Sequence, residues 1–237
     1  YIVGVYSGLR PLLSGKSDST TNLSRNHAVA RVAPGLVSVA GGKYTTYRVI
    51  GKDAVDLAAK ELGFKVAESV TERTPILGAD GYHALANQVP ALARRYNLSE
   101  ERIEHLLGRY GSLISEVLAP AADDASLLEA VPGAESYIWA EVRYAVTHEG
   151  ALHIDDIVSR RLRVAIEFAD RGVAAAQPIA EFVAPLLGWD QNDIEREVSQ
   201  FKQHTEAELA AEAALPAREE NDILERAGSA RATKEEA

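Results

Sequence analysis

The N-terminal part of the chain alternates between short apolar runs and breaks at glycine or proline, a pattern typical of strands. Residues 2–6 form one β-rich run. Residues 27–32 and 36–40 form two more, separated by Ala33-Pro34-Gly35, a sequence that favours a tight turn. We therefore expect a strand over residues 2–6 and a hairpin built from the next two runs.

A different spacing begins at residue 45, where apolar positions recur with the helical period as far as residue 62. Gly41-Gly42 should end the strand before this helix, and Gly63 should end the helix itself. The pattern thus predicts a strand, a glycine turn and a helix in succession. Such a turn brings backbone close to a ligand, and the helix N-terminus presents free N–H groups and a positive dipole end to it.

Helical spacing dominates the chain from about residue 73 onward, which predicts an all-helical second part. We expect N-caps at Ser99, Asp155 and Asp190, because a serine or aspartate just before a helix accepts hydrogen bonds from its first N–H groups. The predicted helices cover residues 81–96, 99–109, 112–118, 136–148, 155–170, 174–187 and 190–214.

Length and composition agree with a globular protein, since 46% of the 237 residues are hydrophobic and 25% are charged. The expected fold class is α+β. Residues 1–72 form the strand-containing region, residues 73–212 an all-α domain and residues 213–237 a charged tail that we expect to be disordered. The chain holds no methionine and opens inside a predicted strand. We therefore expect it to be the C-terminal part of a longer protein.

The sequence has no cysteine, which excludes disulfides and cysteine nucleophiles. No apolar run reaches the ~20 residues that span a bilayer, so we expect at most a peripheral membrane contact. The net charge of −10 argues against nucleic acid as a partner. Residues 1–50 differ from the rest because they hold a single acidic residue, Asp18. The basic residues there, where we expect an anion to bind, are Arg10, Lys16, Arg25, Arg31, Lys43 and Arg48.

Lys43 stands out among these cations because it follows the glycine pair at a helix N-terminus, where positive charge is unfavourable for the helix dipole. A bound anion would explain a lysine at this position. Arg10 and Arg25 flank predicted strands, and each is either a surface arginine or a guanidinium that grips a phosphate or carboxylate. Thr45 and Thr46 are candidates for a helix cap or for hydroxyl donors.

Two further groups of side chains have structural interpretations. His148, Glu149 and His153 lack the i, i+4 spacing that aligns two ligands on one helix face, so we expect no metal site. An ion-pair network between neighbouring helices is expected from Arg160, Arg161 and Arg163 with Glu141 and Glu149.

Three segments together resemble the FAD-dependent glycerol-3-phosphate dehydrogenases. They are residues 7–12 (Ser-Gly-Leu-Arg-Pro-Leu), 24–27 (Ser-Arg-Asn-His) and 41–48 (Gly-Gly-Lys-Tyr-Thr-Thr-Tyr-Arg). Residues 140–146 and 160–163 are similar to the C-terminal domain of that family. The resemblance implies that residues 1–72 are the remnant of the flavoprotein substrate- and FAD-binding domain, followed by the family's helical domain.

The activity that this resemblance implies is oxidation of sn-glycerol 3-phosphate to dihydroxyacetone phosphate, with hydride transfer to FAD and electrons passed to a membrane quinone. It also implies a cytoplasmic protein held peripherally on the cytoplasmic face of the membrane. The G-x-G-x-x-G fingerprint for the FAD pyrophosphate is not found in the sequence. The resemblance implies that this fingerprint and the family's proposed catalytic base both lie in a part of the protein outside these 237 residues. We therefore expect this chain alone to be inactive.

The resemblance also assigns roles to individual residues. Arg10 and Arg25 fall where the family holds the substrate phosphate, and Lys43 falls beside both the flavin ring and the substrate, as a catalytic and substrate-binding residue. The turn residues implied to contact the flavin ring are Gly41, Gly42, Lys43, Tyr44 and Thr45.

Two other functions stay open from the sequence. The helical part is alternatively a stand-alone interaction or dimerisation module, and a homodimer is among the assemblies that the sequence allows. The second alternative is an amine or amino-acid oxidase of the same flavoprotein superfamily, which rests on Arg10 alone. Lys43 together with two arginines favours a phosphate dianion over a carboxylate.

Overall fold

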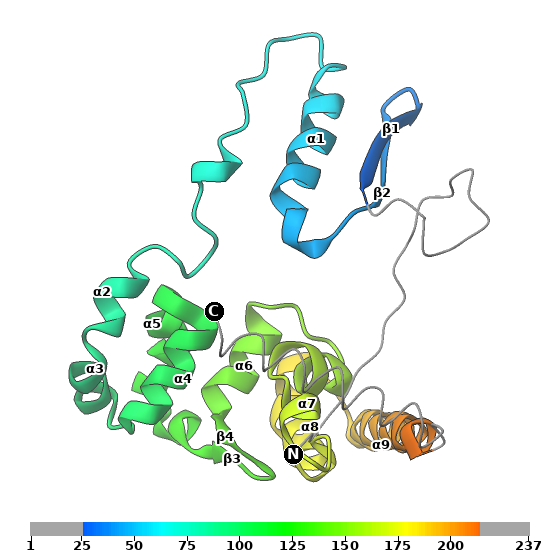
Figure 1. Cartoon of the computed structure of the whole chain (residues 1–237). Helices are drawn as coiled ribbons and strands as arrows, with labels where there is room; N and C mark the ends of the chain where they lie inside the picture. Colours follow the sequence, from blue (N-terminus) through cyan, green and yellow to red (C-terminus); the bar gives the residue numbers. More distant parts are fainter. Residues whose placement is uncertain (1–25, 214–237) are drawn as a thin grey trace, which may run out of the picture. The chain divides into compact units, whose positions relative to one another are not determined.

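The computed structural model describes residues 26–213, which form two compact units (Figure 1). We call residues 26–89 with 106–113 the hairpin unit, and residues 90–105 with 114–213 the helical unit. Both small hairpins and all the helices of the described residues agree with the expected α+β class. The predicted strand over residues 2–6 and the predicted tail beyond residue 213 lie outside the described residues.

The hairpin unit opens with the predicted hairpin. Strands β1 (His27–Ala33) and β2 (Leu36–Gly41) pair antiparallel, with His27 opposite Gly41. Gly35 lies in the turn with a φ of 74°, a left-handed conformation that glycine adopts without steric strain. The turn residues read from the sequence therefore form the predicted connection.

Helix α1 (Tyr47–Ala59) follows a 3₁₀ turn and lies beside both strands, as Figure 1 shows. It ends before the predicted residue 62, with Gly63 beyond it at a φ of 69°. Polar ties join the helix to the hairpin. His27 Nε2 donates to Asp53 Oδ2 at 2.7 Å, and Arg31 forms an ion pair with Glu61.

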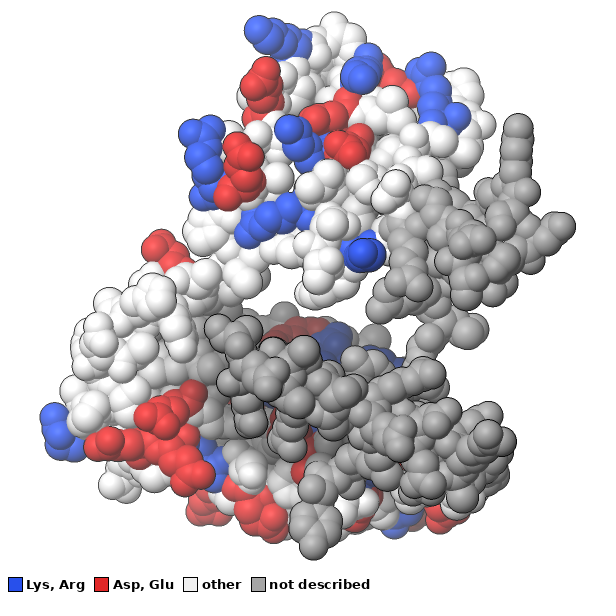
Figure 2. Space-filling model, in the orientation of Figure 1, with Lys and Arg blue, Asp and Glu red and all other residues white. Residues whose placement is uncertain are grey.

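This part of the hairpin unit has no buried core. None of the residues of β1, β2 or α1 is buried, although all three elements carry large apolar side chains. Val55 of α1 is 62% exposed and Val32 of β1 is 59% exposed. Figure 2 shows basic and acidic side chains interspersed over the hairpin and α1. Local backbone geometry and polar ties, rather than apolar burial, therefore hold these elements together.

The helix predicted over residues 81–96 is interrupted. The structure has α2 (Tyr82–Ala86) and α3 (Val89–Tyr96) in its place. Pro90 explains the interruption, because it has no N–H to bond the Ala86 carbonyl and is tolerated only in the first turn of a new helix.

Helix α4 (Glu100–Tyr110) agrees with the prediction to within one residue. Ser99 is its N-cap, with Oγ accepting the Arg102 N–H at 3.2 Å, as expected. The predicted helix over 112–118 begins with a 3₁₀ turn at Gly111–Leu113 and continues as α5 (Ile114–Leu118).

The helix predicted over residues 136–148 was wrong at its start. Strands β3 (Ala130–Val131) and β4 (Ala134–Ile138) form a second hairpin, and α6 (Trp139–Thr147) begins only after it. The Glu141 carboxylate accepts the Ile138 N–H at 3.0 Å, which marks Ile138 as the last residue before the helix. Pro132-Gly133 makes the turn, with Gly133 at a φ of 79°.

The helix predicted over residues 155–170 is replaced by two short elements. A π-helical turn (Asp156–Arg161) comes first, Arg163 takes a φ of 65°, and α7 (Val164–Glu167) follows. Asp155 does not cap this segment through its side chain, contrary to expectation. Left-handed backbone at an arginine is uncommon and has no signature in the sequence.

Helices α8 (Val173–Leu187) and α9 (Gln191–Ala213) match their predictions and pack together. Asp190 caps α9 as expected, because its Oδ1 accepts the Asp193 N–H at 2.9 Å. The core of the helical unit lies around α8, with Val142 of α6 fully buried and Trp139 and Val146 packed against it. Within residues 26–213, no helix has the length and apolar character needed to cross a membrane.

Candidate functional site at the glycine turn

The turn between β2 and α1 depends on its two glycines. Gly41 has a φ of 74° and Gly42 a φ of 90°, which are both left-handed conformations. A Cβ atom on Gly42 would lie 2.7 Å from Ile50 Cδ1 and 3.1 Å from His27 Cβ. Gly42 is therefore required both for the backbone conformation and for the close approach of β1 and α1 behind the turn.

Lys43 links the glycines to the 3₁₀ turn Tyr44–Thr46 with extended backbone, and it is exposed. Its carbonyl accepts the Thr46 N–H at 3.0 Å and the Thr46 hydroxyl at 2.9 Å. The hydroxyl of Thr46 therefore donates back to Lys43 and does not cap α1, which corrects one of the two interpretations of that residue. Thr45 is exposed within the 3₁₀ turn.

Aromatic and cationic side chains extend this turn. The Tyr44 and Tyr47 rings are stacked, with centroids 5.8 Å apart, and the Arg48 guanidinium carbon lies 5.3 Å from the Tyr47 centroid. Arg48 Nη1 donates to the Thr71 carbonyl and lies 3.3 Å from the Thr71 hydroxyl. Tyr44 itself is 91% exposed. The stack therefore connects an exposed tyrosine of the turn to the segment that follows α1.

The electrostatics of the turn favour an anion. The N-terminus of α1 carries the positive end of the helix dipole, and the first N–H groups of a helix have no partner inside it. Lys43 and Arg48 add two cations at the same end of the helix. The arrangement is able to hold an anionic group or to stabilise negative charge that develops on a bound ligand.

The structure places five of the predicted site residues on this one turn, from Gly41 at the end of β2 to Thr45. Arg10 and Arg25, the predicted phosphate ligands, lie outside the described residues. The sequence assigned no individual role to Tyr47 or Arg48, although Arg48 belongs to the basic residues where we expected an anion to bind. The signal that singled out Lys43, a cation at a helix N-terminus, also applies to Arg48.

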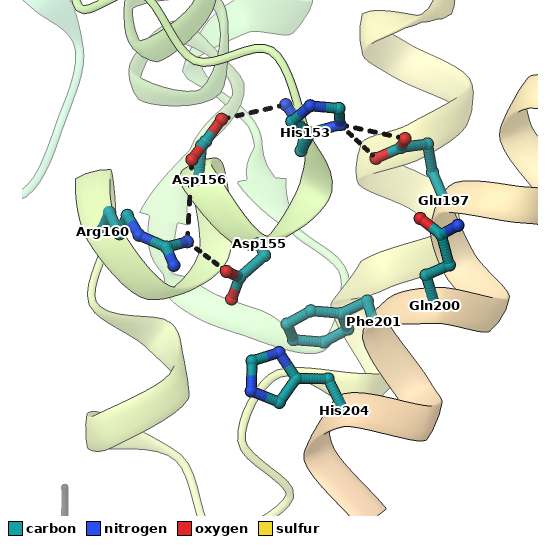
Figure 3. Close-up of a pocket in the computed structure, with 8 residues that line it drawn as sticks. All are labelled: His153, Asp155, Asp156, Arg160, Glu197, Gln200, Phe201 and His204. Atoms are coloured by element: carbon teal, nitrogen blue, oxygen red, sulfur yellow. Dashed lines mark hydrogen bonds and ion pairs between the residues drawn. The ribbon is translucent and has the colours of Figure 1, made fainter. Parts of the chain in front are cut away.

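A second candidate is an open pocket of about 460 Å³ in the helical unit, between the π-helical turn and α9. Its lining, drawn in Figure 3, consists of His153, Asp155, Asp156, Arg160, Glu197, Gln200, Phe201 and His204.

The carboxylates of this pocket already have protein partners. Burial alone would raise the pKa of Asp155, but hydrogen bonds from Ser159 and Arg160 hold the pKa below its ordinary value. Glu197 is nearly buried and lies 3.0 Å from His153 Nδ1. Among residues 26–213, no group of three or more histidine or acidic side chains is placed to hold a metal ion. The pocket is thus explained as a polar network that joins the π-helical turn to α9.

The structure shows several contacts of the arginines and glutamates in the predicted network. Glu141 pairs with His105 across 3.0 Å, and Arg160 pairs with the two aspartates of its own segment. Of the predicted partners, Arg161 and Glu149 do meet, through an Nε–H bond to the Glu149 carbonyl at 2.9 Å.

The fold and the site define a class of protein in which a strand, a glycine turn and a helix precede a helical domain. Residues 69–194 match the family described as the C-terminal domain of alpha-glycerophosphate oxidase. The chain belongs to this family.

Relatives extend the similarity over most of the chain. It is 53% identical over 212 residues to glycerol-3-phosphate dehydrogenase 2 of Mycobacterium tuberculosis, which covers 90% of this chain and 36% of that protein. It is 32% identical to a mitochondrial glycerol-3-phosphate dehydrogenase of Arabidopsis thaliana, covering 86% of this chain and 35% of that protein. The chain therefore spans about a third of the length of these relatives.

A solved structure has a similar fold. The glycerol-3-phosphate dehydrogenase of Bacillus halodurans, determined in complex with FAD, superposes with a TM-score of 0.63. The match covers 77% of this chain and 37% of the other, at 18% sequence identity.

Proposed function

We propose that this chain is part of an FAD-dependent glycerol-3-phosphate dehydrogenase, whose remaining length supplies the FAD pyrophosphate site and the catalytic base. The observation that carries the proposal is the glycine turn: two left-handed glycines place an exposed lysine directly before the 3₁₀ turn that leads into α1. The similarity to proteins named glycerol-3-phosphate dehydrogenase supports it.

The residues of the turn fit a flavin. Gly42 packs against Ile50 and His27 behind the turn, while Lys43 and Tyr44 are exposed on it and are free to contact a ligand ring. Bound FAD would supply hydride acceptance at this turn. Lys43 and the N–H groups at the start of the 3₁₀ turn Tyr44–Thr46 are the donors that would stabilise negative charge on the bound group.

Substrate binding follows from the same charges. We propose that Arg10 and Arg25 hold the phosphate of glycerol 3-phosphate, and that Lys43 contributes a third positive charge from the turn. Replacing Arg10 by alanine should weaken substrate binding by at least ~1.5 kcal/mol, the scale of a lost charged hydrogen bond. An unchanged KM in Arg10→Ala would remove this residue from the site.

The activity is tested with the full-length protein and FAD under exclusion of oxygen. Glycerol 3-phosphate should bleach the visible flavin absorbance. Bleaching only by an amine or an amino acid would keep the flavoprotein but reject the phosphate site. A full-length protein that binds no FAD would reject the proposal in favour of a helical interaction module. The chain of residues 1–237 alone should neither retain FAD nor turn over.

We also propose that the electrons pass to a membrane quinone and that the protein associates peripherally with the cytoplasmic face of the membrane. The resemblance to the quinone-linked dehydrogenases supports this acceptor. Substrate-reduced protein should be reoxidised by a soluble quinone analogue faster than by oxygen, and it should float with lipid vesicles in a density gradient. Failure of both would point to another acceptor.

A further inference from the structure

Arg48 is an unfavourable residue for its position. It is the second residue of α1, where a positive charge opposes the helix dipole. Lysine or arginine in a first helical turn therefore calls for a compensating interaction. Arg48 obtains one from Thr71, whose carbonyl and hydroxyl both lie at its Nη1.

The guanidinium connects two parts of the chain. Thr71 belongs to a 3₁₀ turn (Thr71–Arg73) that lies 23 residues beyond Arg48. The guanidinium carbon also lies 5.3 Å from the Tyr47 ring centroid, and Tyr47 stacks on Tyr44. A continuous set of contacts therefore runs from Thr71 through Arg48 and Tyr47 to Tyr44.

The end of this set of contacts is the turn assigned to the flavin. Tyr44 directly follows Lys43, and its exposed ring has Tyr47 as its stacking partner. Tyr44 is 91% exposed and Tyr47 is 45% exposed, so packing covers little of the first ring and only part of the second. The Arg48 guanidinium lies over the Tyr47 ring and is itself held by Thr71, so it restrains that ring.

We propose that Arg48 is a positioning residue for the flavin turn: it orients Tyr47 and Tyr44, and through them the backbone around Lys43, without touching the flavin itself. This inference rests on the proposed function. A planar guanidinium both stacks on an aromatic ring and donates in a fixed plane, whereas a lysine ammonium supplies only a point charge. Planarity, and not charge alone, is therefore the property that the position requires.

The test measures the Kd for FAD in the full-length protein carrying Arg48→Ala or Arg48→Lys. Both variants should bind FAD about tenfold more weakly, with the flavin spectrum shifted alike. Arg73→Ala, which removes an exposed arginine from the adjacent 3₁₀ turn, is the matched control and should bind FAD as the parent does. Hydrogen exchange of the β1–β2 amides should be unchanged, which would show that the hairpin still folds.

A double-mutant cycle separates positioning from general stability. If Arg48 acts through Tyr47, then Arg48→Ala should have little further effect on the FAD Kd once Tyr47→Leu is present. Fully additive effects would overturn the positioning role, as would a parent-like Kd in Arg48→Ala or full rescue by Arg48→Lys.

The parent protein is measured first, so that a failure of the positioning role gives a different result from a failure of the proposed function. A parent that binds FAD and is bleached by glycerol 3-phosphate, with Arg48 variants that behave identically, would overturn only the positioning role. A parent that binds no FAD would overturn both.

Discussion

The helical unit and the β1–β2–α1 part of the hairpin unit are stabilised in different ways. In the helical unit, side chains of α6, α8 and the π-helical turn are fully buried in one apolar core. In the hairpin unit, β1, β2 and α1 contain no buried residue and carry exposed apolar side chains such as Val55. The hairpin is tied to α1 by polar contacts, among them His27 with Asp53.

This difference separates stability from function within one chain. Burial of apolar surface is the dominant favourable term in folding, so most of the stability of the chain should reside in the helical unit. The candidate site lies in the other unit, where glycine conformations and charged contacts set the geometry. Substitutions in the two units should therefore differ both in the size of their effects and in the conditions that modify them.

The largest expected effect is loss of core volume in α8. Ile179 is fully buried, and Ile179→Ala should lower the free energy of unfolding by about 4 kcal/mol, through lost transfer energy and a residual cavity. Val55→Ala in α1 is the matched control and should change it by less than ~0.5 kcal/mol, because Val55 is 62% exposed. Urea unfolding measures both. Similar losses in the two variants would contradict the contrast between the units.

The glycines in the two hairpin turns provide a second comparison. Gly133 and Gly35 have φ values of 79° and 74°, so alanine is strained at both by about 1–2 kcal/mol. At Gly133 a Cβ atom would also lie 2.8 Å from the backbone of Ala174 and Ala175, whereas nothing lies within 4 Å of one at Gly35.

Gly133→Ala should therefore destabilise the helical unit by about 3 kcal/mol, the sum of backbone strain and overpacking. Gly35→Ala should show the strain alone. The unfolding of Gly133→Ala is measured by tryptophan fluorescence, because both tryptophans, Trp139 and Trp189, pack against the core of the helical unit. The loss of stability in Gly35→Ala is measured by hydrogen exchange of the β1–β2 amides. Equal losses in the two turns would show that the clash with α8 is relieved by a backbone shift.

Regular spacing and side-chain caps were predictable from the sequence. Helices α4, α8 and α9 were placed to within about one residue, and Ser99 and Asp190 cap as expected. The first hairpin was also predicted, because Pro34-Gly35 separates two clear apolar runs. These features depend on interactions within a few residues, which a single sequence displays directly.

The failures involve features without such a local signature. Glu141 ends β4 by accepting a hydrogen bond from Ile138, but the apolar spacing continues through both elements. The left-handed Arg163 interrupts the helix predicted over residues 155–170, and nothing in the sequence pattern marks this interruption either. At the site, the glycine turn and the position of Lys43 before a helix were predictable because these residues follow one another in the sequence. The proposed role of Arg48 depends on its contact with Thr71, which only the tertiary structure brings close.

A smaller effect should come from a hydrogen bond at the edge of the core. The Tyr144 hydroxyl donates to Glu116 at 2.8 Å, and burial followed by this bond raises the pKa of Tyr144 to about 12. Tyr144→Phe should lower the free energy of unfolding by about 1 kcal/mol at neutral pH.

The pH dependence of this effect has a definite sign. The folded protein holds the Tyr144 proton more tightly than the unfolded chain, whose tyrosine pKa is about 10. The stability that it contributes is therefore present below pH ~10 and is lost between pH ~10 and ~12. Urea unfolding at several pH values should show a steeper decline in the parent than in Tyr144→Phe. Parallel declines would mean that Tyr144 does not titrate in this range.

The smallest expected effect lies in the hairpin unit, at Glu61. Hydrogen bonds from Arg31 and from the Gly35 N–H hold the pKa of Glu61 below its ordinary value. The contribution of Glu61 to the stability of the folded state is thus present above the ordinary glutamate pKa, and it is lost as the pH falls through the lowered pKa of the folded protein. Because the Arg31 side chain is exposed, salt should also screen the interaction.

Glu61→Gln should accelerate hydrogen exchange of the β1–β2 amides at neutral pH and low salt, and the difference from the parent should shrink with added salt. The Gly35 amide shift should titrate in the parent and not in the variant. Glu68→Gln, at an exposed position of the same unit, is the control and should match the parent. A salt-independent effect of Glu61→Gln would indicate that packing, and not charge, ties the hairpin to α1. The contrast between the two units would then fail in the hairpin unit itself, since the exposed apolar side chains of α1 and the strands would have to be contributing after all.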